Sequence, residues 1–212
     1  GEKPMYRESR FRSEPENEYI TPVNITLAVI NVAVFFIMSI LERAFGNQYL
    51  YQYGAMFPPA VLGGQWYRLI TSSFIHFDIA HLFNNMLLFI TLGSYLERAF
   101  GKIRYIIFFF SAAVLSSLAS MFHMIYSKDL AFSAGASGIV FGMIGALLYM
   151  VIRNKGRFQN LTIRRFMIMI LLSLYFGFVT AGVDNAAHVG GLCAGFLLGI
   201  LLYRKEKAQK HH

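Results

Sequence analysis

Charged residues and cysteine are both scarce in this chain of 212 residues. Charged side chains make up 14% of it, whereas a soluble domain usually carries about 25%. The single cysteine, Cys193, lies inside an apolar run, so the chain has no disulfide framework. The net charge is +8, yet no basic helix or basic-aromatic motif accompanies it. The composition therefore argues against a soluble domain and against a nucleic-acid-binding protein.

Hydrophobic residues, in contrast, make up 56% of the chain and raise its mean hydropathy to +0.50. A membrane-spanning helix needs about 20 mainly apolar residues. Six stretches meet or nearly meet this length: residues 23–41, 74–95, 103–126, 135–152, 163–181 and 186–203. They follow one another without a linker, so we predict one all-α, polytopic membrane domain of six transmembrane helices at residues 21–203. Residues 1–20 and 204–212 are expected to be cytoplasmic tails.

Lysine and arginine are distributed unevenly among the connections between these six segments. With both chain ends placed on the cytoplasmic side, every one of the 19 basic residues except Arg43, Arg68 and Lys128 falls on that side. Cytoplasmic loops of membrane proteins collect lysine and arginine. The bias therefore predicts that both termini are cytoplasmic, and it explains the positive net charge without an acidic partner.

The first outer connection, residues 42–73, is long and rich in aromatic side chains: Tyr49, Tyr51, Tyr53, Trp66 and Tyr67. Amphipathic aromatic residues favour the level of the lipid headgroups. We predict that this connection lies partly in the membrane interface. A plain extracellular loop is the alternative.

Polar residues recur near the predicted outer ends of the second, fourth and sixth segments. His76, His81 and Asn85 lie in the first half of the second, Ser137 begins the fourth and His188 begins the sixth. At about 1.5 Å of rise per residue, these positions fall at a similar depth. Polar groups in a membrane are costly and often functional, although they also serve as ordinary contacts between helices. Alone, Ser137 is explained by close helix packing and His188 by a satisfied buried histidine or an ion pathway, but their combination indicates a site.

Glycine spacing indicates that the fourth and sixth segments pack together. Gly191 and Gly195 follow His188 on one helical face, and Gly145 follows Ser137 in the same way. Small faces of this kind permit close backbone approach in lipid. Packing of the two faces would bring the hydroxyl of Ser137 to the imidazole of His188. A serine becomes an effective nucleophile when an adjacent base takes its proton, so the pair predicts nucleophilic catalysis.

An acyl-transfer site also needs hydrogen-bond donors for the developing oxyanion. His81 and Asn85 share one face of the second segment and can both donate, as can the backbone N–H of Ser137 at a helix start. Interhelical hydrogen bonding is the alternative role for the His81 and Asn85 pair. The neighbouring Asn84 is expected to point elsewhere, and His76 to be structural.

No acid stands out as a third member of the catalytic group. Asp184 lies four residues before His188 and could orient its imidazole or cap the sixth helix, of which we favour the cap. Phe141 could instead support the ring of His188 by stacking, which gives a dyad in place of a triad.

These motifs together resemble those of the rhomboid intramembrane serine proteases. The Gly-x-Ser-Gly motif of that family appears at residues 135–138, its His-x-x-x-Asn at 81–85 and its Ala-His-x-x-Gly at 187–191. Its Trp-Arg signature is matched loosely by residues 66–68. The order of the motifs and the six-segment topology agree over roughly residues 20–203.

The resemblance implies a six-helix rhomboid-like bundle with Ser137 and His188 as a catalytic dyad. It implies an oxyanion hole formed by His81, Asn85 and the Ser137 amide. A movable gate for substrate entry would correspond to the fifth helix and the 180–185 loop.

Three further residues would support this site, namely Gly135, Gly138 and Phe141. Some members of the family carry a tyrosine where Phe141 stands. The ring is therefore kept in this chain, whereas a hydrogen bond from that position is lost.

The resulting hypothesis is a serine endopeptidase that cuts in or beside a substrate's transmembrane segment, near the extracytoplasmic face. Its expected partners are the lipid bilayer and membrane-protein substrates whose helices are weakened by glycine or proline; no cofactor or metal is expected. The sequence lacks His-Glu-x-x-His and a pair of intramembrane aspartates, which argues against other types of membrane protease. A non-catalytic binder of transmembrane clients and a His-lined transporter are the alternatives. The short termini, without a signal or transit segment, favour a bacterial inner membrane.

Overall fold

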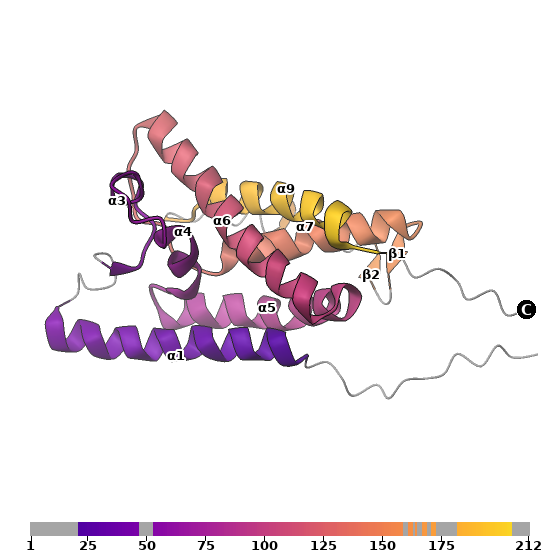
Figure 1. Cartoon of the computed structure of the whole chain (residues 1–212), viewed down its shortest axis with the longest axis horizontal. Helices are drawn as coiled ribbons and strands as arrows, with labels where there is room; N and C mark the ends of the chain where they lie inside the picture. Colours follow the sequence, from indigo (N-terminus) through magenta and orange to yellow (C-terminus); the bar gives the residue numbers. More distant parts are fainter. Residues whose placement is uncertain are drawn as a thin grey trace, which may run out of the picture.

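The computed structural model describes residues 21–46, 53–158, 161–162 and 182–204, with the single positions 164, 167, 168, 171 and 172. Within them, the bundle in Figure 1 consists of the long helices α1 (Pro22–Phe45), α5 (Ile79–Phe100), α6 (Lys102–Ser127), α7 (Ser137–Arg153) and α9 (Asn185–Leu202). The shorter elements are α3 (Pro58–Leu62), α4 (Arg68–Thr71) and the 3-10 helix η1 (Ser72–Phe74). Two-residue strands, β1 (Arg157–Phe158) and β2 (Leu161–Thr162), pair antiparallel beyond the end of α7.

Four of these helices, α1, α5, α6 and α9, are long and apolar enough to cross a membrane, while α7 is a shorter apolar helix of 17 residues. Large apolar side chains are exposed on the outer faces of the four: Phe36, Ile40, Phe83, Leu87, Phe122, Leu197 and Leu201. An apolar surface of this kind is stable in contact with lipid, whereas its exposure to water is unfavourable. The chain is therefore an α-helical integral membrane protein. The predicted span at 163–181 lies outside the described residues apart from isolated positions, so six spans remain a prediction.

The start of α5 differs from the predicted one. The apolar pattern placed the helix start at residue 74, with His76 inside it, but α5 begins at Ile79. Asp78 has an extended backbone, and its carboxylate accepts the N–H of His81 at 2.8 Å, as in an N-cap. His76 therefore lies in a turn before the helix. The prediction was wrong because the apolar residues of that turn continue the hydrophobic run.

A buried carboxylate joins α1 to α5 at one end of the bundle. Glu97 of α5 is only 3% exposed, and it accepts the N–H of Val23 at 3.1 Å and that of Asn24 at 2.7 Å. Both N–H groups belong to the first turn of α1, where no intrahelical acceptor exists. The hydroxyl of Tyr105 on α6 donates to Oδ1 of Asn24 at 2.7 Å. These bonds fix the start of α1 against two neighbouring helices.

Helices α7 and α9 pack closely through their glycine faces. A Cβ added to Gly191 would collide with the carbonyl oxygen of Gly138, and one added to Gly195 would collide with that of Gly142. Only glycine permits this backbone approach, as in other membrane helix pairs. The predicted contact between the two small faces is confirmed. It sets the beginning of α7 beside the beginning of α9.

The first outer connection folds around a buried arginine. Arg68 is 3% exposed and donates to the carbonyl of Ala55 at 2.6 Å and to Oε1 of Gln65 at 2.7 Å. Trp66 and Tyr67 remain exposed, as the interfacial prediction requires, whereas Tyr49 and Tyr51 lie outside the described residues. The position of this loop relative to the headgroups stays a prediction.

Candidate active site

A cavity of about 410 Å³ lies where the first turns of α5, α7 and α9 meet the connecting loops. Its walls include all the residues predicted to form or support the catalytic site: His81, Asn85, Gly135, Ser137, Gly138, Phe141 and His188. Three stretches separated by dozens of residues in sequence thus converge on one space. Asn84, which was expected to point elsewhere, also lines this cavity, so that expectation was wrong.

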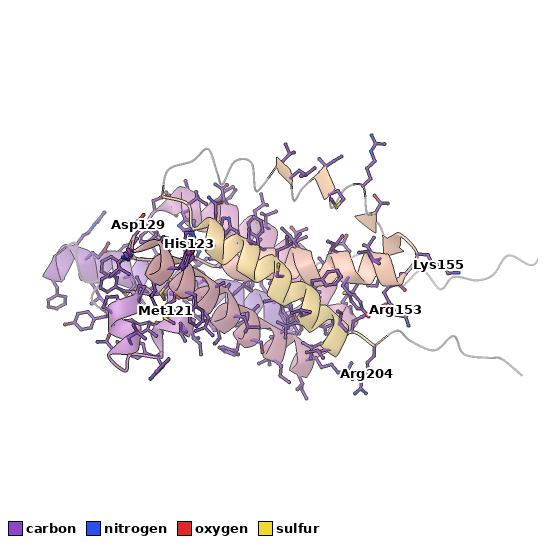
Figure 2. The ribbon with its side chains drawn as sticks, turned by 90° about the horizontal axis from the view of Figure 1, so that it is seen from above. Met121, His123, Asp129, Arg153, Lys155 and Arg204 are labelled. Carbon is purple, nitrogen blue, oxygen red and sulfur yellow. The ribbon has the colours of Figure 1, made fainter. Side chains whose placement is uncertain are left out.

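The cavity lies at the end of the bundle remote from the basic residues Arg153, Lys155 and Arg204 (Figure 2). Figure 2 shows Arg153, Lys155 and Arg204 toward one end, and His123 and Asp129 toward the other. Helix α7 runs from Ser137 to Arg153, so the serine is at the end opposite this basic group. The site therefore lies at the end of the bundle away from this basic group, and its depth in the membrane stays a prediction.

Ser137 is held by the backbone turn that leads into α7. Gly135 has φ of +124°, a conformation that favours glycine, and its N–H donates to the carbonyl of Ser72 at 2.9 Å. The next N–H, that of Ala136, donates to Nε2 of His76 at 3.3 Å. Ser137 is the first helical residue, so its own N–H and that of Gly138 are first-turn donors without intrahelical acceptors. The turn presents a hydroxyl and two backbone donors together.

His188 lies in the second turn of α9 and is 8% exposed. Phe141 stacks on its ring, with ring centroids 4.2 Å apart and 12° between the planes. Its Nδ1 is buried without a hydrogen-bond partner among the described residues, which leaves Nε2 as the ring nitrogen open to the cavity. Packing, not a carboxylate, therefore orients this imidazole.

Ser137 and His188 share the cavity wall, but no hydrogen bond joins them in the described part of the chain. Catalytic hydrogen bonds are often long in structures without substrate and shorten when substrate binds. The close contact between α7 and α9 fixes the two helix starts as a pair. The arrangement suits a hydroxyl and a base that act on the same bound group.

His81 and Asn85 face the turn at Gly135 from α5. A Cβ added to Gly135 would lie 2.7 Å from Cε1 of His81, so a side chain is excluded at this position. Asn85 is 6% exposed, and its amide donates to the carbonyl of His81 at 3.1 Å. One amide hydrogen of Asn85 is therefore used within α5, and the second remains for a group in the cavity.

His76 has a structural role, as the sequence predicted. It is 1% exposed, and its ring contacts that of His81 edge to face, with centroids 5.1 Å apart. Burial, reinforced by the neighbouring His81, lowers the pKa of His76 from 6.5 to about 4. The neutral ring can then accept the N–H of Ala136. The connection between residues 76 and 136 carries no signal in a single sequence.

No group of three or more His, Cys, Asp or Glu side chains in the described residues converges as a metal site would require. Cys193 is exposed on the outer side of α9 and does not line the cavity. The cavity wall carries the hydroxyl of Ser137, the imidazoles of His81 and His188, the amide of Asn85, and the carboxylates of Asp78 and Asp184.

The fold and the cavity define a class of protein. Its members are α-helical integral membrane proteins in which a serine and a histidine line one cavity at one end of the helix bundle. The Rhomboid domain matches residues 63–205, about two thirds of the chain. The chain belongs to the rhomboid family.

Several relatives carry rhomboid names. Rhomboid protease GluP of Bacillus subtilis (strain 168) is 33% identical over 173 residues, which cover 82% of this chain and 33% of GluP. RHOMBOID-like protein 4 of Arabidopsis thaliana is 36% identical over 148 residues, 67% of this chain and 35% of that protein. Rhomboid protease AarA of Providencia stuartii is 29% identical over 201 residues, 84% of this chain and 71% of AarA. The chain thus spans about a third of the length of the first two relatives.

Proposed function

We propose that this chain is an intramembrane serine endopeptidase with Ser137 as nucleophile and His188 as general base. The observation that carries the proposal is the cavity that Ser137 and His188 share. Ser137 is the first residue of α7, and His188 on the paired helix α9 stacks against Phe141 of α7. The names of the matched relatives, GluP and AarA among them, support the same reaction class.

In the first half of the reaction, Oγ of Ser137 attacks the scissile carbonyl carbon while Nε2 of His188 takes the hydroxyl proton. The tetrahedral intermediate then collapses, and His188 returns the proton to the leaving amine as the C–N bond breaks. An acyl-enzyme on Ser137 remains. Water then adds to the acyl group with His188 again as the base, which releases the new carboxylate and restores the serine.

The negative charge of each tetrahedral intermediate needs preorganised donors. The first-turn N–H groups of Ser137 and Gly138 are fixed by the helix start, and the free amide hydrogen of Asn85 comes from the opposite wall. His81 completes this group as a fourth donor when its cavity-facing nitrogen carries a proton. Donors from two helices would then enclose one oxyanion.

Substrates of this site are expected to be transmembrane segments that unwind locally. A peptide bond inside a regular helix is shielded by the helix's own hydrogen bonds, so glycine or proline near the cut favours access. The basic end of the bundle (Figure 2) favours cytoplasmic termini and a site near the extracytoplasmic face.

Purified protein in detergent tests the assignment directly. A fluorophosphonate probe should label wild-type protein, His188→Ala should suppress labelling, and Ser137→Ala should abolish it. The same three proteins, incubated in liposomes with a panel of tagged single-span proteins, should release fragments only with the wild type. Labelling that persists in Ser137→Ala would reject the proposal. Binding of single-span proteins without release of fragments would favour a non-catalytic binder. Ion flux that does not depend on Ser137 would favour a transporter.

A further inference from the structure

The carboxylate of Asp184 accepts hydrogen bonds from three separate parts of the chain. Oδ1 accepts the N–H of Ala187 at 2.9 Å, which is the N-cap of α9. Oδ2 accepts the hydroxyl of Ser133 at 2.6 Å and also that of Ser120 on α6. An N-cap needs only the first of these bonds. The other two attach the start of α9 to a loop and to a neighbouring helix.

The loop partner, Ser133, connects Asp184 to both the outer loop and the nucleophile. Its backbone exchanges two hydrogen bonds of 2.9 Å with Met56 in the first outer connection. Two residues further along, Gly135 is bound to Ser72 and begins the turn that presents Ser137. A displacement of Ser133 therefore moves the turn that carries the nucleophile.

The helix partner, Ser120, is fully buried in α6. One turn earlier on the same helix, Ser116 packs against Gly138, where an added Cβ would lie 2.8 Å from Cβ of Ser116. Helix α6 thus touches the first turn of α7 at one point and Asp184 at another. Through Asp184 and Ser116, helix α6 therefore contacts the starts of both α9 and α7.

We propose that Asp184 is a positioning residue, which sets the distance between the start of α9 and the turn that carries Ser137. The inference rests on the proposed function of Ser137 and His188. Asp184 acts through Ser133 and Ser120, and no hydrogen bond joins it to the imidazole of His188 in the described residues. It therefore differs from the acid of a catalytic triad, which hydrogen-bonds the histidine.

A carboxylate suits this position because it only accepts hydrogen bonds and has room for several donors. In Asp184→Asn, the amide oxygen can still cap Ala187, but the second oxygen becomes an NH₂ donor. The hydroxyls of Ser133 and Ser120 then lose their acceptor, while the cap is kept, since asparagine caps as well as aspartate. This substitution separates the three-way contact from the helix cap.

The decisive variants remove one hydroxyl and leave Asp184 intact. Ser133→Ala should lower both kcat for a transmembrane substrate and the rate of Ser137 labelling by a fluorophosphonate, each by about tenfold, since small misplacements of catalytic groups are costly. KM should change little, because the hydroxyl of Ser133, although this residue lines the cavity, is already donated to Asp184. Ser133→Thr, which keeps the hydroxyl on this half-buried loop residue, should restore the labelling rate. Ser133→Ala added to Asp184→Asn should cost less than it does alone, because both substitutions break the same contact.

A second measurement does not depend on proteolysis. In the Ser137→Ala background, Asp184→Asn should increase hydrogen exchange of the backbone amides in the 130–136 loop, and the melting temperature should stay within a few degrees. Unchanged exchange, or wild-type labelling in Ser133→Ala, would overturn the positioning role and leave only a helix cap. Persistent labelling of Ser137→Ala would instead refute the proposed function, and the exchange result would still stand.

Discussion

At the scale of single residues, the orientation of His188 depends on an aromatic ring. Phe141 lies one helical turn after Ser137 on α7 and stacks on the imidazole, whose Nδ1 has no partner in the described residues. Aromatic contacts of this kind contribute about 0.5–1.5 kcal/mol beyond the area they bury. The same helix therefore supplies the nucleophile and the support for its base.

We expect Phe141→Ala to slow fluorophosphonate labelling of Ser137 by about threefold to tenfold, the equivalent of the lost stacking energy. Phe141→Tyr keeps the ring and should label at close to the wild-type rate. Labelling time courses in detergent provide the measurement. Wild-type labelling of Phe141→Ala would mean that another contact orients the imidazole.

Gly135 offers a second test at this scale, because its backbone conformation and its surroundings both require glycine. Gly135→Ala would strain a φ of +124° and place a Cβ against His81, so we expect loss of peptidase activity and a destabilisation of about 2–3 kcal/mol. Gly46→Ala is the matched control, since Gly46 has φ of +104° but no atom within 4 Å of the added Cβ. The control should show the backbone strain alone and keep its activity. Equal losses of activity in the two variants would show that backbone strain, and not the contact of the added Cβ with His81, causes the effect of Gly135→Ala.

The buried His76 makes stability depend on pH. Its folded pKa of about 4 lies below the unfolded value of 6.5, so the unfolded chain binds more protons between these values. The neutral ring makes its full contribution to the free energy of unfolding above pH 6.5. This contribution is lost as the pH falls toward 4, and the free energy of unfolding falls by about 3 kcal/mol over the whole window. His76→Gln can still accept the Ala136 N–H without titrating, so its melting temperature should fall less between pH 7 and pH 4.5. Parallel curves for the two proteins would exclude His76 as the source.

At the scale of helices, the contact between α7 and α9 is the element pair that defines the site. Gly195→Ala would push a Cβ into the backbone of Gly142, and overpacking of this kind costs about 1–3 kcal/mol. Gly199→Ala is milder, because its nearest neighbour, Ala146, lies 3.1 Å from the added Cβ. We expect the first variant to unfold at lower SDS fraction than the second, and to label more slowly at Ser137. The reverse order would contradict the closer backbone contact at Gly195.

The sequence predicted most of these elements from hydrophobic runs alone, because a membrane helix is long and uniformly apolar. It also predicted the α7–α9 contact from glycine spacing. It placed the start of α5 wrongly, since Phe74, Ile75 and Phe77 are apolar although they precede the Asp78 cap. Contacts that join distant residues, such as His76 with Ala136 or Asp184 with Ser133, follow from tertiary packing and leave no periodicity in one sequence.

At the scale of the whole molecule, the distribution of charge predicts how the protein sits in the membrane. Arg153 and Arg204 lie toward the end of the bundle opposite Asp129 (Figure 2), in agreement with cytoplasmic termini and an outward-facing cavity. In a Cys193→Ser background, Lys128→Cys should react with a membrane-impermeant maleimide added outside intact cells. Arg153→Cys should react only after permeabilisation. The opposite pattern would invert the orientation and place the cavity on the cytoplasmic side.

The bond between Glu97 and the start of α1 has a consequence for biosynthesis. Residues 22–45 leave the ribosome long before residue 97 does, so the first helix enters the bilayer without the carboxylate that later binds Val23 and Asn24. Its early N–H groups must stay hydrated near the headgroups until the second hydrophobic segment has been made and inserted. The bonds between the start of α1 and Glu97 therefore form only after the whole of α5 has been translated.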